Sequence, residues 1–220
     1  MNSGNYVAIH ENETVFIVDD DASIGEGLGN LLESVGINAE HYESAEAFRE
    51  RWNRSRAGCL LLDARLPGMS GVDLQGELIS SGIGIPVIFM TAHGDMPMVR
   101  KVLKAGAVEF LIKPFQKEEL LQAVKHAFTF DRERRAEDAI QESIQARVKI
   151  LSEREREVLS MVTAGLLNKQ IAAQLNLSEV TVKLHRRHVM VKMKAESLAD
   201  LVKMCERVRL DSWKAPENSR

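Results

Sequence analysis

Short apolar runs alternate with stretches of helical spacing along the first half of the chain. The runs have the length of strands, and they are Thr14–Val18, Asn38–Tyr42, Cys59–Leu62, Pro86–Met90 and Val108–Ile112. Between them, apolar residues recur at helical spacing over 22–35, 44–53, 71–80 and 96–104. Strands that alternate with helices predict a parallel sheet. We therefore expect residues 13–130 to form an α/β domain with a doubly wound sheet of five parallel strands.

The pattern becomes purely helical in the second half. Residues 115–147 contain few helix-breaking residues, which favours one long helix that runs on into a helical linker over 131–150. Ser152 and Glu155 then have the spacing of a capping box, and Gly165 is placed to end the helix that follows.

Two further helices are predicted after that point. Residues 168–174 form a short helix, "LNL" forms a turn, and Ser178 caps a longer helix. We expect residues 151–210 to form an all-α domain that contains a helix-turn-helix.

Reactive polar residues follow four of the predicted strands. They are Asp19, Asp20 and Asp21 after the first strand, then Asp63, Thr91 and Lys113. The carboxyl ends of parallel strands meet at one edge of a sheet, so these side chains are expected to converge. For "VDDD" alone, a solvated turn that caps the next helix is an equally good interpretation.

The combination of these side chains indicates phosphoryl chemistry. Clustered carboxylates suit a hard cation such as Mg²⁺. The carboxylate of Asp63 can then attack phosphorus as a nucleophile, while Lys113 neutralises charge on the phosphoryl oxygens. Thr91 can donate its hydroxyl to one of those oxygens. The site is predicted to become an acyl phosphate at Asp63.

The first domain resembles the receiver domain of two-component response regulators. The resemblance is carried by "VDDD" (18–21), "LLDARLPGMSG" (61–71), "TAHGD" (91–95) and "AGAVEFLIKPF" (105–115). It implies a flavodoxin-like fold and phosphorylation of Asp63 by a sensor histidine kinase. It also implies a Mg²⁺ site made by Asp20 directly, Asp19 through water, Asp63 and the backbone carbonyl of Arg65.

The same resemblance assigns further roles. Thr91 and Lys113 would hold the phosphoryl group, and Phe110 would be the aromatic side chain that turns when the domain is phosphorylated. Asp21 would only cap the following helix.

Charge is unevenly distributed along the chain. Residues 1–128 hold 11 Lys and Arg against 18 Asp and Glu, whereas residues 151–220 hold 13 against 9. Glu179 is the only acid between residues 168 and 194, where the basic residues are Lys169, Lys183, Arg186, Arg187, Lys192 and Lys194. A basic second helix after a tight turn suits the major groove of double-stranded DNA, and a solvated basic helix is the alternative.

The second domain resembles the LuxR-type helix-turn-helix of the NarL/FixJ class. The matching residues are "LSEREREVL" (151–159), "AGLLNKQIAAQLNLSEVTVKLHRRHVMVKM" (164–193) and "SLADLV" (197–202). The family position implies DNA contact by Lys183, Leu184 and Arg187. Lys169 and Arg186, as basic residues of the same segment, are also expected to bind DNA.

The FixJ-like subgroup is the part of that class that the whole chain resembles. This implies a homodimer when phosphorylated, contact with RNA polymerase, and control of aromatic-hydrocarbon breakdown, nitrogen fixation or nodulation. The dimer face would include Arg100, Lys104 and Glu109. Arg100 departs from the subgroup, which usually has an apolar residue there.

The sequence shows neither a membrane span nor a signal peptide. No apolar run reaches about 18 residues, and no basic stretch followed by an apolar one opens the chain. We expect a cytoplasmic protein whose Cys59 and Cys205 are reduced.

Two other classes of function share some of these features. A phosphatase similar to haloacid dehalogenases would use Asp63 for turnover, but it usually has a second carboxylate two residues later, where this chain has Arg65. A small-molecule sensor would need an apolar pocket with aromatic anchors, and only 5% of the residues are aromatic. We therefore predict a regulator that catalyses only its own phosphorylation and dephosphorylation.

Overall fold

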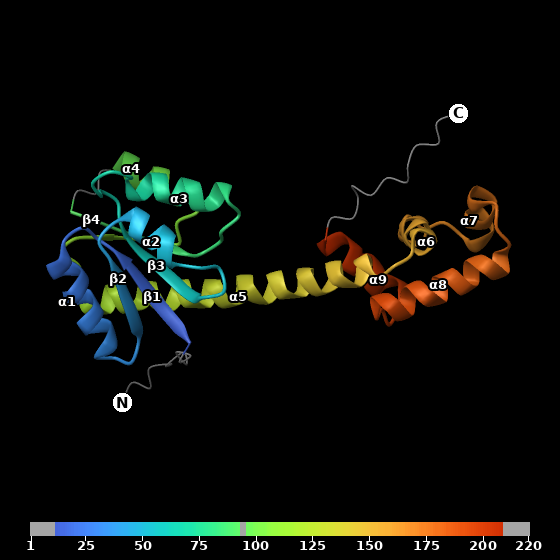
Figure 1. Ribbon diagram of the computed structural model, residues 1–220, viewed down its shortest axis with the longest axis horizontal. Coiled ribbons are helices and arrows are strands. Elements are labelled where there is room, and N and C mark those ends of the chain that lie inside the picture. Colours follow the sequence, from blue (N-terminus) through green and yellow to red (C-terminus); the bar gives the residue numbers. More distant parts are fainter. Residues whose placement is uncertain (1–11, 93–95, 209–220) are drawn as a thin grey trace. The chain divides into compact units, whose positions relative to one another are not determined.

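The computed structural model describes residues 12–92 and 96–208, with the backbone alone at 96–98 and 101. The chain forms two compact units, of which the first ends at Arg135 and the second begins at Ala136. Helix α5 (Lys117–Lys149) contains that boundary (Figure 1). Residues 93–95 of the "TAHGD" motif and the end of the predicted 151–210 domain lie outside the described residues.

The first unit is built on a parallel sheet. Its strands are β1 (Glu13–Val18), β2 (Asn38–Tyr42), β3 (Ala57–Asp63), β4 (Val87–Thr91) and β5 (Glu109–Ile112). They pair in the order β2-β1-β3-β4-β5, so the doubly wound five-stranded sheet is confirmed for the described part of the chain. Each strand lies within two residues of its predicted bounds.

Helices cover both faces of this sheet (Figure 1). They are α1 (Ala22–Glu33), α2 (Ala45–Arg51), α3 (Gly71–Ser80), α4 (Met96–Lys104) and the first part of α5. Val15 and Ile17 of β1 pack with α1 and α5, whereas Phe16 and Val18 pack with α2, α3 and α4. A strand covered on both faces needs apolar side chains at every position, which explains the unbroken apolar run.

The second unit is helical. Its elements are the last part of α5, α6 (Glu153–Thr163), α7 (Asn168–Leu175), α8 (Glu179–Met193) and α9 (Leu198–Arg207). Ser152 and Glu155 form the predicted capping box, and Ser178 caps α8 by accepting from the amide of Thr181. Asn176 adopts a left-handed conformation at the turn between α7 and α8, with φ of 54°. The predicted helix-turn-helix is therefore present.

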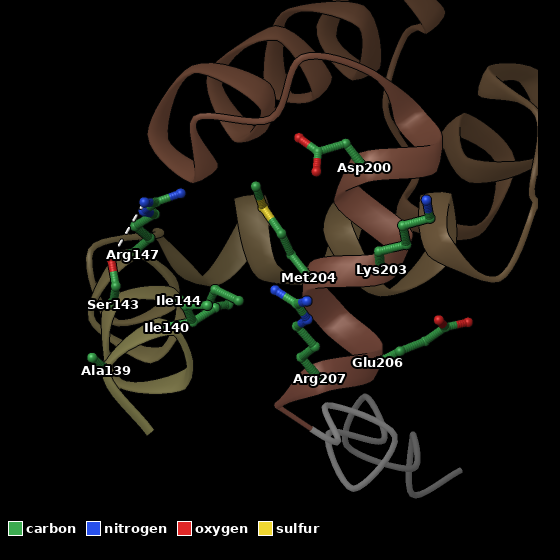
Figure 2. A pocket seen from close by; sticks show the side chains of 10 residues that line it. All are labelled: Ala139, Ile140, Ser143, Ile144, Arg147, Asp200, Lys203, Met204, Glu206 and Arg207. Carbon is green, nitrogen blue, oxygen red and sulfur yellow. Dashed lines mark hydrogen bonds between the residues drawn. The ribbon is translucent and has the colours of Figure 1, made fainter. Parts of the chain in front are cut away.

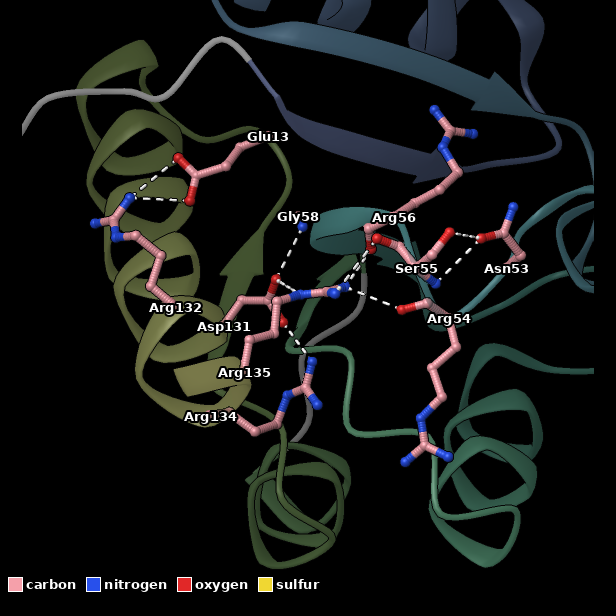
Figure 3. Close-up of polar contacts among 10 residues, drawn as sticks. All are labelled: Glu13, Asn53, Arg54, Ser55, Arg56, Gly58, Asp131, Arg132, Arg134 and Arg135. Carbon is pink, nitrogen blue, oxygen red and sulfur yellow. Dashed lines mark hydrogen bonds and ion pairs between the residues drawn. The ribbon is translucent and has the colours of Figure 1, made fainter. Parts of the chain in front are cut away.

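At the amino-terminal end of β3, a buried carboxylate of α5 holds the sheet. Asp131 is 1% exposed, and it accepts hydrogen bonds from the amide of Gly58 at 3.0 Å, from Arg134 at 2.6 Å and from Arg135 at 2.7 Å (Figure 3). Arg135 also donates to the carbonyl of Arg56 in the loop before β3. Residues 131–135, which the sequence places in the linker, thus make close contacts within the first unit.

A second ion pair lies beside this carboxylate. Arg132 donates to both oxygens of Glu13, at 2.9 and 3.0 Å, and Glu13 is 4% exposed (Figure 3). Both free cysteines, Cys59 and Cys205, are buried. Burial raises the pKa of the Cys59 thiol well above its usual value, and the nearby charges of Asp131 and Glu13 add to this effect. Among the described residues, no helix is both long and apolar enough to cross a membrane.

Candidate functional site

Three of the predicted side chains meet at the carboxyl edge of the sheet. The ammonium Nζ of Lys113 lies 2.6 Å from Oδ2 of Asp19 and 2.6 Å from Oδ2 of Asp63. Lys113 follows β5, Asp19 follows β1 and Asp63 ends β3, and β3 lies between the other two strands in the sheet. The Asp19 side chain is 2% exposed, whereas those of Asp63 and Lys113 are 13% and 15% exposed. One cation therefore bridges two carboxylates within reach of solvent.

The bridge compensates the like charges of the two aspartates. Burial acts to lower the pKa of Lys113, but hydrogen bonds and charge attraction from Asp19 and Asp63 outweigh it and leave that pKa raised. The lysine thus stays protonated at neutral pH and keeps a positive charge between the two carboxylates.

The three consecutive aspartates have different surroundings. Asp19 is buried, Asp20 is exposed, and Asp21 caps α1 by accepting from the amides of Ser23 and Ile24. Hydrogen bonds from the side chain and the amide of Ser23 lower the pKa of Asp21. The prediction that Asp21 caps the helix is confirmed, so two aspartates of the run remain for the site.

Other predicted residues surround Asp63. The amide of Arg65 donates to Oδ1 of Asp63 at 2.8 Å, which brings the backbone of Arg65 beside the carboxylate. Thr91 is the last residue of β4 and is 1% exposed, and its carbonyl accepts from the amide of Lys113 at 2.8 Å. Phe110 pairs with Phe89 in the sheet and lies partly buried against the core on the α2–α4 face.

The donor types at this edge suit Mg²⁺, which prefers carboxylate and carbonyl oxygens. Asp19, Asp20 and Asp63 supply carboxylates, and Arg65 has its backbone next to Asp63. As placed, no three His, Cys, Asp or Glu side chains among the described residues could hold a metal ion together. The ammonium of Lys113 lies between two of the three carboxylates, and Asp20 stays exposed. The residues fit the ion in chemistry, because one or two carboxylates are enough to hold Mg²⁺ when water completes its coordination.

The predicted dimer-face residues lie on neighbouring elements of the first unit. Arg100 and Lys104 are exposed on α4, and Glu109 begins β5. Glu109 has a partner in its own chain, because its Oε2 lies 3.8 Å from Nδ1 of His126.

The predicted DNA-contact residues gather on α7 and α8. Lys169, Lys183 and Arg187 are exposed, and Leu184 is exposed by 51%. Arg186 differs from these, because its guanidinium donates to Oδ1 of Asn168 at 2.8 Å and links α8 to the start of α7.

Sequence reasoning gave no role in DNA contact to Val180, an exposed apolar side chain of this helix. Val180 is 76% exposed and stands four residues before Leu184, so both lie on one face of α8. Apolar residues on the exposed face of a basic helix suit contact with thymine methyl groups. The helical spacing of Val180 and Leu184 was the signal that could have found it.

The remaining basic residue of α8 near its end has a structural partner. Lys192 lies 2.6 Å from Oε2 of Glu155, which is 4% exposed. Burial acts to raise the pKa of Glu155, but the hydrogen bonds from Lys192 and the amide of Ser152 outweigh it and leave the pKa lowered. Lys192 therefore ties α8 to α6.

An open pocket of about 670 Å³ lies within the second unit, between α5 and α9 (Figure 2). Ile140, Ile144 and Met204 give it an apolar part, and Arg147 and Lys203 are among its charged residues. Neither the residues of the predicted phosphorylation site nor the predicted DNA-contact residues line this pocket.

Both units match known families. Residues 15–125 match the family described as response regulator receiver domain, and residues 149–205 match the family described as bacterial regulatory proteins, luxR family. Nodulation protein W of Bradyrhizobium diazoefficiens is 45% identical over 203 residues, which cover 92% of this chain and 89% of that protein.

Two further relatives agree with these matches. Transcriptional regulatory protein FixJ of Rhizobium meliloti is 44% identical, over 87% of this chain and 94% of that one. A low-resolution structure of the response regulator StyR has a TM-score of 0.77 and 46% identity, and the match covers 89% of this chain and 99% of that one.

Proposed function

We infer that this chain, which belongs to the FixJ-like two-component response regulators with a LuxR-type DNA-binding domain, is a transcription factor. Phosphorylation of Asp63 switches its activity. A sensor histidine kinase supplies the phosphoryl group. The observation that carries the proposal is the bridge from Lys113 to Asp19 and Asp63 at the carboxyl edge of the sheet.

The chemistry at the site is attack by a carboxylate oxygen of Asp63 on phosphorus, which forms the acyl phosphate while the bond from phosphorus to the kinase's histidine nitrogen breaks and the histidine leaves. The Asp63 carboxylate is partly exposed beside Lys113, so a phosphodonor can approach it. Lys113 then stabilises the negative charge of the transferring group, and Thr91 donates its hydroxyl to a phosphoryl oxygen. Asp19, Asp20, Asp63 and the carbonyl of Arg65 would hold Mg²⁺, which supplies further positive charge. The protein catalyses only its own phosphorylation and dephosphorylation.

The switch couples this site to the α4–β5 face. Thr91 moves toward the phosphoryl group, and Phe110 turns inward into the space that it leaves. The surface of Arg100, Lys104 and Glu109 changes as a result and forms the face of a homodimer. Glu109 can then exchange His126 for Arg100 of the other copy.

The output is binding to promoter DNA. Lys183, Leu184 and Arg187 enter the major groove, Lys169 contacts phosphate, and Arg186 orients α8 through Asn168 while lying near the backbone of the DNA. A dimer engages two half-sites about one helical turn apart, and its second contact gains from high effective concentration. The bound dimer contacts RNA polymerase. Because DNA and RNA polymerase lie in the bacterial cytoplasm, the protein acts there.

One experiment tests both halves of the proposal. Labelled acetyl phosphate should modify the wild-type protein and Asp73→Asn, and it should leave Asp63→Asn unlabelled. Asp73 is a matched control, because it is an exposed aspartate of the same unit. Phosphorylated wild-type protein should bind promoter DNA more tightly than Asp63→Asn does. Labelling of Asp63→Asn at the wild-type rate would refute the assignment of the acceptor.

The DNA face is tested by two substitutions and a control. Arg187→Ala and Lys183→Ala should weaken DNA binding. A variant that loses a phosphate contact should lower the salt slope by about 1, whereas one that loses a base contact should relax specificity at one position. Lys203→Ala removes one positive charge from α9 of the same unit and should leave affinity and slope unchanged. Wild-type affinity and salt slope in both Arg187→Ala and Lys183→Ala would place the DNA on another face.

A further inference from the structure

His41 directs its imidazole ring at the backbone of the acidic loop between β1 and α1. Its Nε2 lies 2.8 Å from the carbonyl oxygen of Asp19. A carbonyl can only accept a hydrogen bond, so Nε2 carries the proton and donates. His41 sits in β2 opposite Ile17 of β1, two residues before Asp19. The contact thus holds the chain where β1 gives way to the proposed metal site.

The ring has room because residue 25 is glycine. A Cβ atom at Gly25 would lie 2.5 Å from Cε1 of His41 and closer still to its Cδ2 and Nε2. Carbon atoms in contact normally stand 3.5–4.0 Å apart. Any side chain at position 25 would therefore displace the ring, and with it the atom that binds Asp19.

Asp19 has a hydrogen-bond partner at every polar position. Its amide donates to the carbonyl of Tyr42 at 3.2 Å, its Oδ1 accepts from the amide of Asp21 at 3.0 Å, and its Oδ2 accepts from Lys113 at 2.6 Å. The carbonyl that His41 binds belongs to the planar peptide that joins Asp19 to Asp20. Fixing this carbonyl therefore fixes the direction in which the chain presents Asp20.

We propose that His41 is a positioning residue for the Mg²⁺ site and that Gly25 leaves the space that its ring occupies. This inference rests on the proposed function, because it assumes that Asp20 is a metal ligand. His41 does not touch the ion or the phosphoryl group. It holds the Asp19–Asp20 peptide in one orientation, so that the site needs less ordering when the ion binds. Loss of a partner that orients metal ligands typically lowers metal affinity by about 10- to 100-fold.

Isothermal titration of the full chain with Mg²⁺ tests the proposal. His41→Phe keeps a flat ring but removes the donor, and it should bind Mg²⁺ about tenfold more weakly than wild type. His41→Gln places an amide N–H near the position of Nε2 and should stay within about threefold of wild type. Gly25→Ala displaces the ring without removing it, and it should weaken Mg²⁺ binding about as much as His41→Phe does.

A second readout separates positioning from general damage to the fold. Phosphorylation of His41→Phe by acetyl phosphate should be slow at low Mg²⁺ and should return to within about twofold of wild type at saturating Mg²⁺, because the defect lies in metal affinity. A fold defect would persist at every Mg²⁺ concentration. If His41→Phe does not fold, the Gly25→Ala and His41→Gln pair gives the same comparison.

Three outcomes overturn the inference. Mg²⁺ affinity of His41→Phe within twofold of wild type would show that the hydrogen bond does not matter to the site. Equal losses in His41→Gln and His41→Phe would assign the effect to ring packing. A rate defect that saturating Mg²⁺ does not rescue would assign it to the fold. All three leave the proposed function intact, whereas failure of the wild-type protein to bind Mg²⁺ would refute the Mg²⁺ site on which both proposals depend.

Discussion

Buried carboxylates lie at both ends of β3, and the charges around them are balanced in opposite ways. At the carboxyl end, Lys113 forms ion pairs with both Asp19 and Asp63, and Asp20 is exposed beside them. At the amino end, Arg134 and Arg135 both form ion pairs with Asp131, and Arg132 forms one with the neighbouring Glu13. The first end has an excess of acid and the second an excess of base.

Because of this difference, the carboxyl end can bind a cation, whereas the carboxylate at the amino end already has all its hydrogen-bond partners. Each carboxylate oxygen of Asp131 already has a donor, and the amide of Gly58 adds a third bond. The excess acid around Asp63 instead leaves a place for added positive charge. Buried carboxylates alone are therefore poor markers of function, and the ratio of acids to bases around them is a better one.

Removing the Asp131 charge should give the largest change in stability. Asp131→Asn leaves two guanidinium groups without their buried partner, so it should cost about 3 kcal/mol of unfolding free energy. Asp63→Asn should cost less than about 1 kcal/mol, because Lys113 keeps Asp19 as a partner. Urea unfolding followed by Trp52 fluorescence in a Trp213→Phe background measures the first unit. Equal losses for the two variants would remove the distinction between the two ends.

Replacing the bases should separate activity from stability. Lys113→Met should slow phosphorylation by acetyl phosphate about 100-fold, because it removes a group that stabilises charge on the phosphoryl oxygens. Arg135→Met should leave that rate within about twofold and cost about 1–2 kcal/mol of stability, since it leaves a buried acceptor with one donor fewer. Rates and urea midpoints from the same preparations decide. A slow Arg135→Met protein would mean that the amino end takes part in the chemistry.

The outer ion pair of the amino end should matter less. Arg132→Gln should cost about 1 kcal/mol, because Arg132 is partly exposed and glutamine can still donate one hydrogen bond to Glu13. The same urea titration measures it. A loss as large as that of Asp131→Asn would show that the two acids of this end act as one network.

The smallest effect should appear in the pH dependence of stability. The pKa of Lys113 is raised in the folded protein, so its contribution is fully present below the ordinary lysine pKa of about 10.4. It is lost as the pH rises through the higher folded value. The difference in unfolding free energy between wild type and Lys113→Met should therefore stay constant from pH 6 to 9 and shrink above pH 10. A difference that changes near pH 7 would place the titration elsewhere.

The two ends also differ in how well the sequence predicts them. Asp63 and Lys113 could be placed together because each ends an apolar strand, and parallel strands end at one edge. Asp131 offered no such signal, since it lies in an unbroken helical stretch and its partner Gly58 is 73 residues away.

Some contacts cannot be read from local patterns at all. His41 and Gly25 looked like an ordinary strand residue and an ordinary helix residue, and only the packing of α1 on β2 brings them together. Arg186 was grouped with the DNA contacts by its charge, whereas its bond to Asn168 depends on how α7 and α8 pack. The periodicity of a sequence specifies its elements, but contacts between side chains of different elements depend on the tertiary arrangement.

The amide of Gly58 can report on the contact between Asp131 of α5 and the start of β3. It donates to a buried carboxylate, and a Cβ atom at this position would lie 2.9 Å from the carbonyl carbon of Thr14 and closer still to its oxygen. Its hydrogen can exchange with solvent only when Asp131 withdraws, so its exchange rate reports how often this part of α5 leaves the sheet. Measured by NMR with and without beryllofluoride at Asp63, that single rate would reveal whether events at one end of β3 loosen the other.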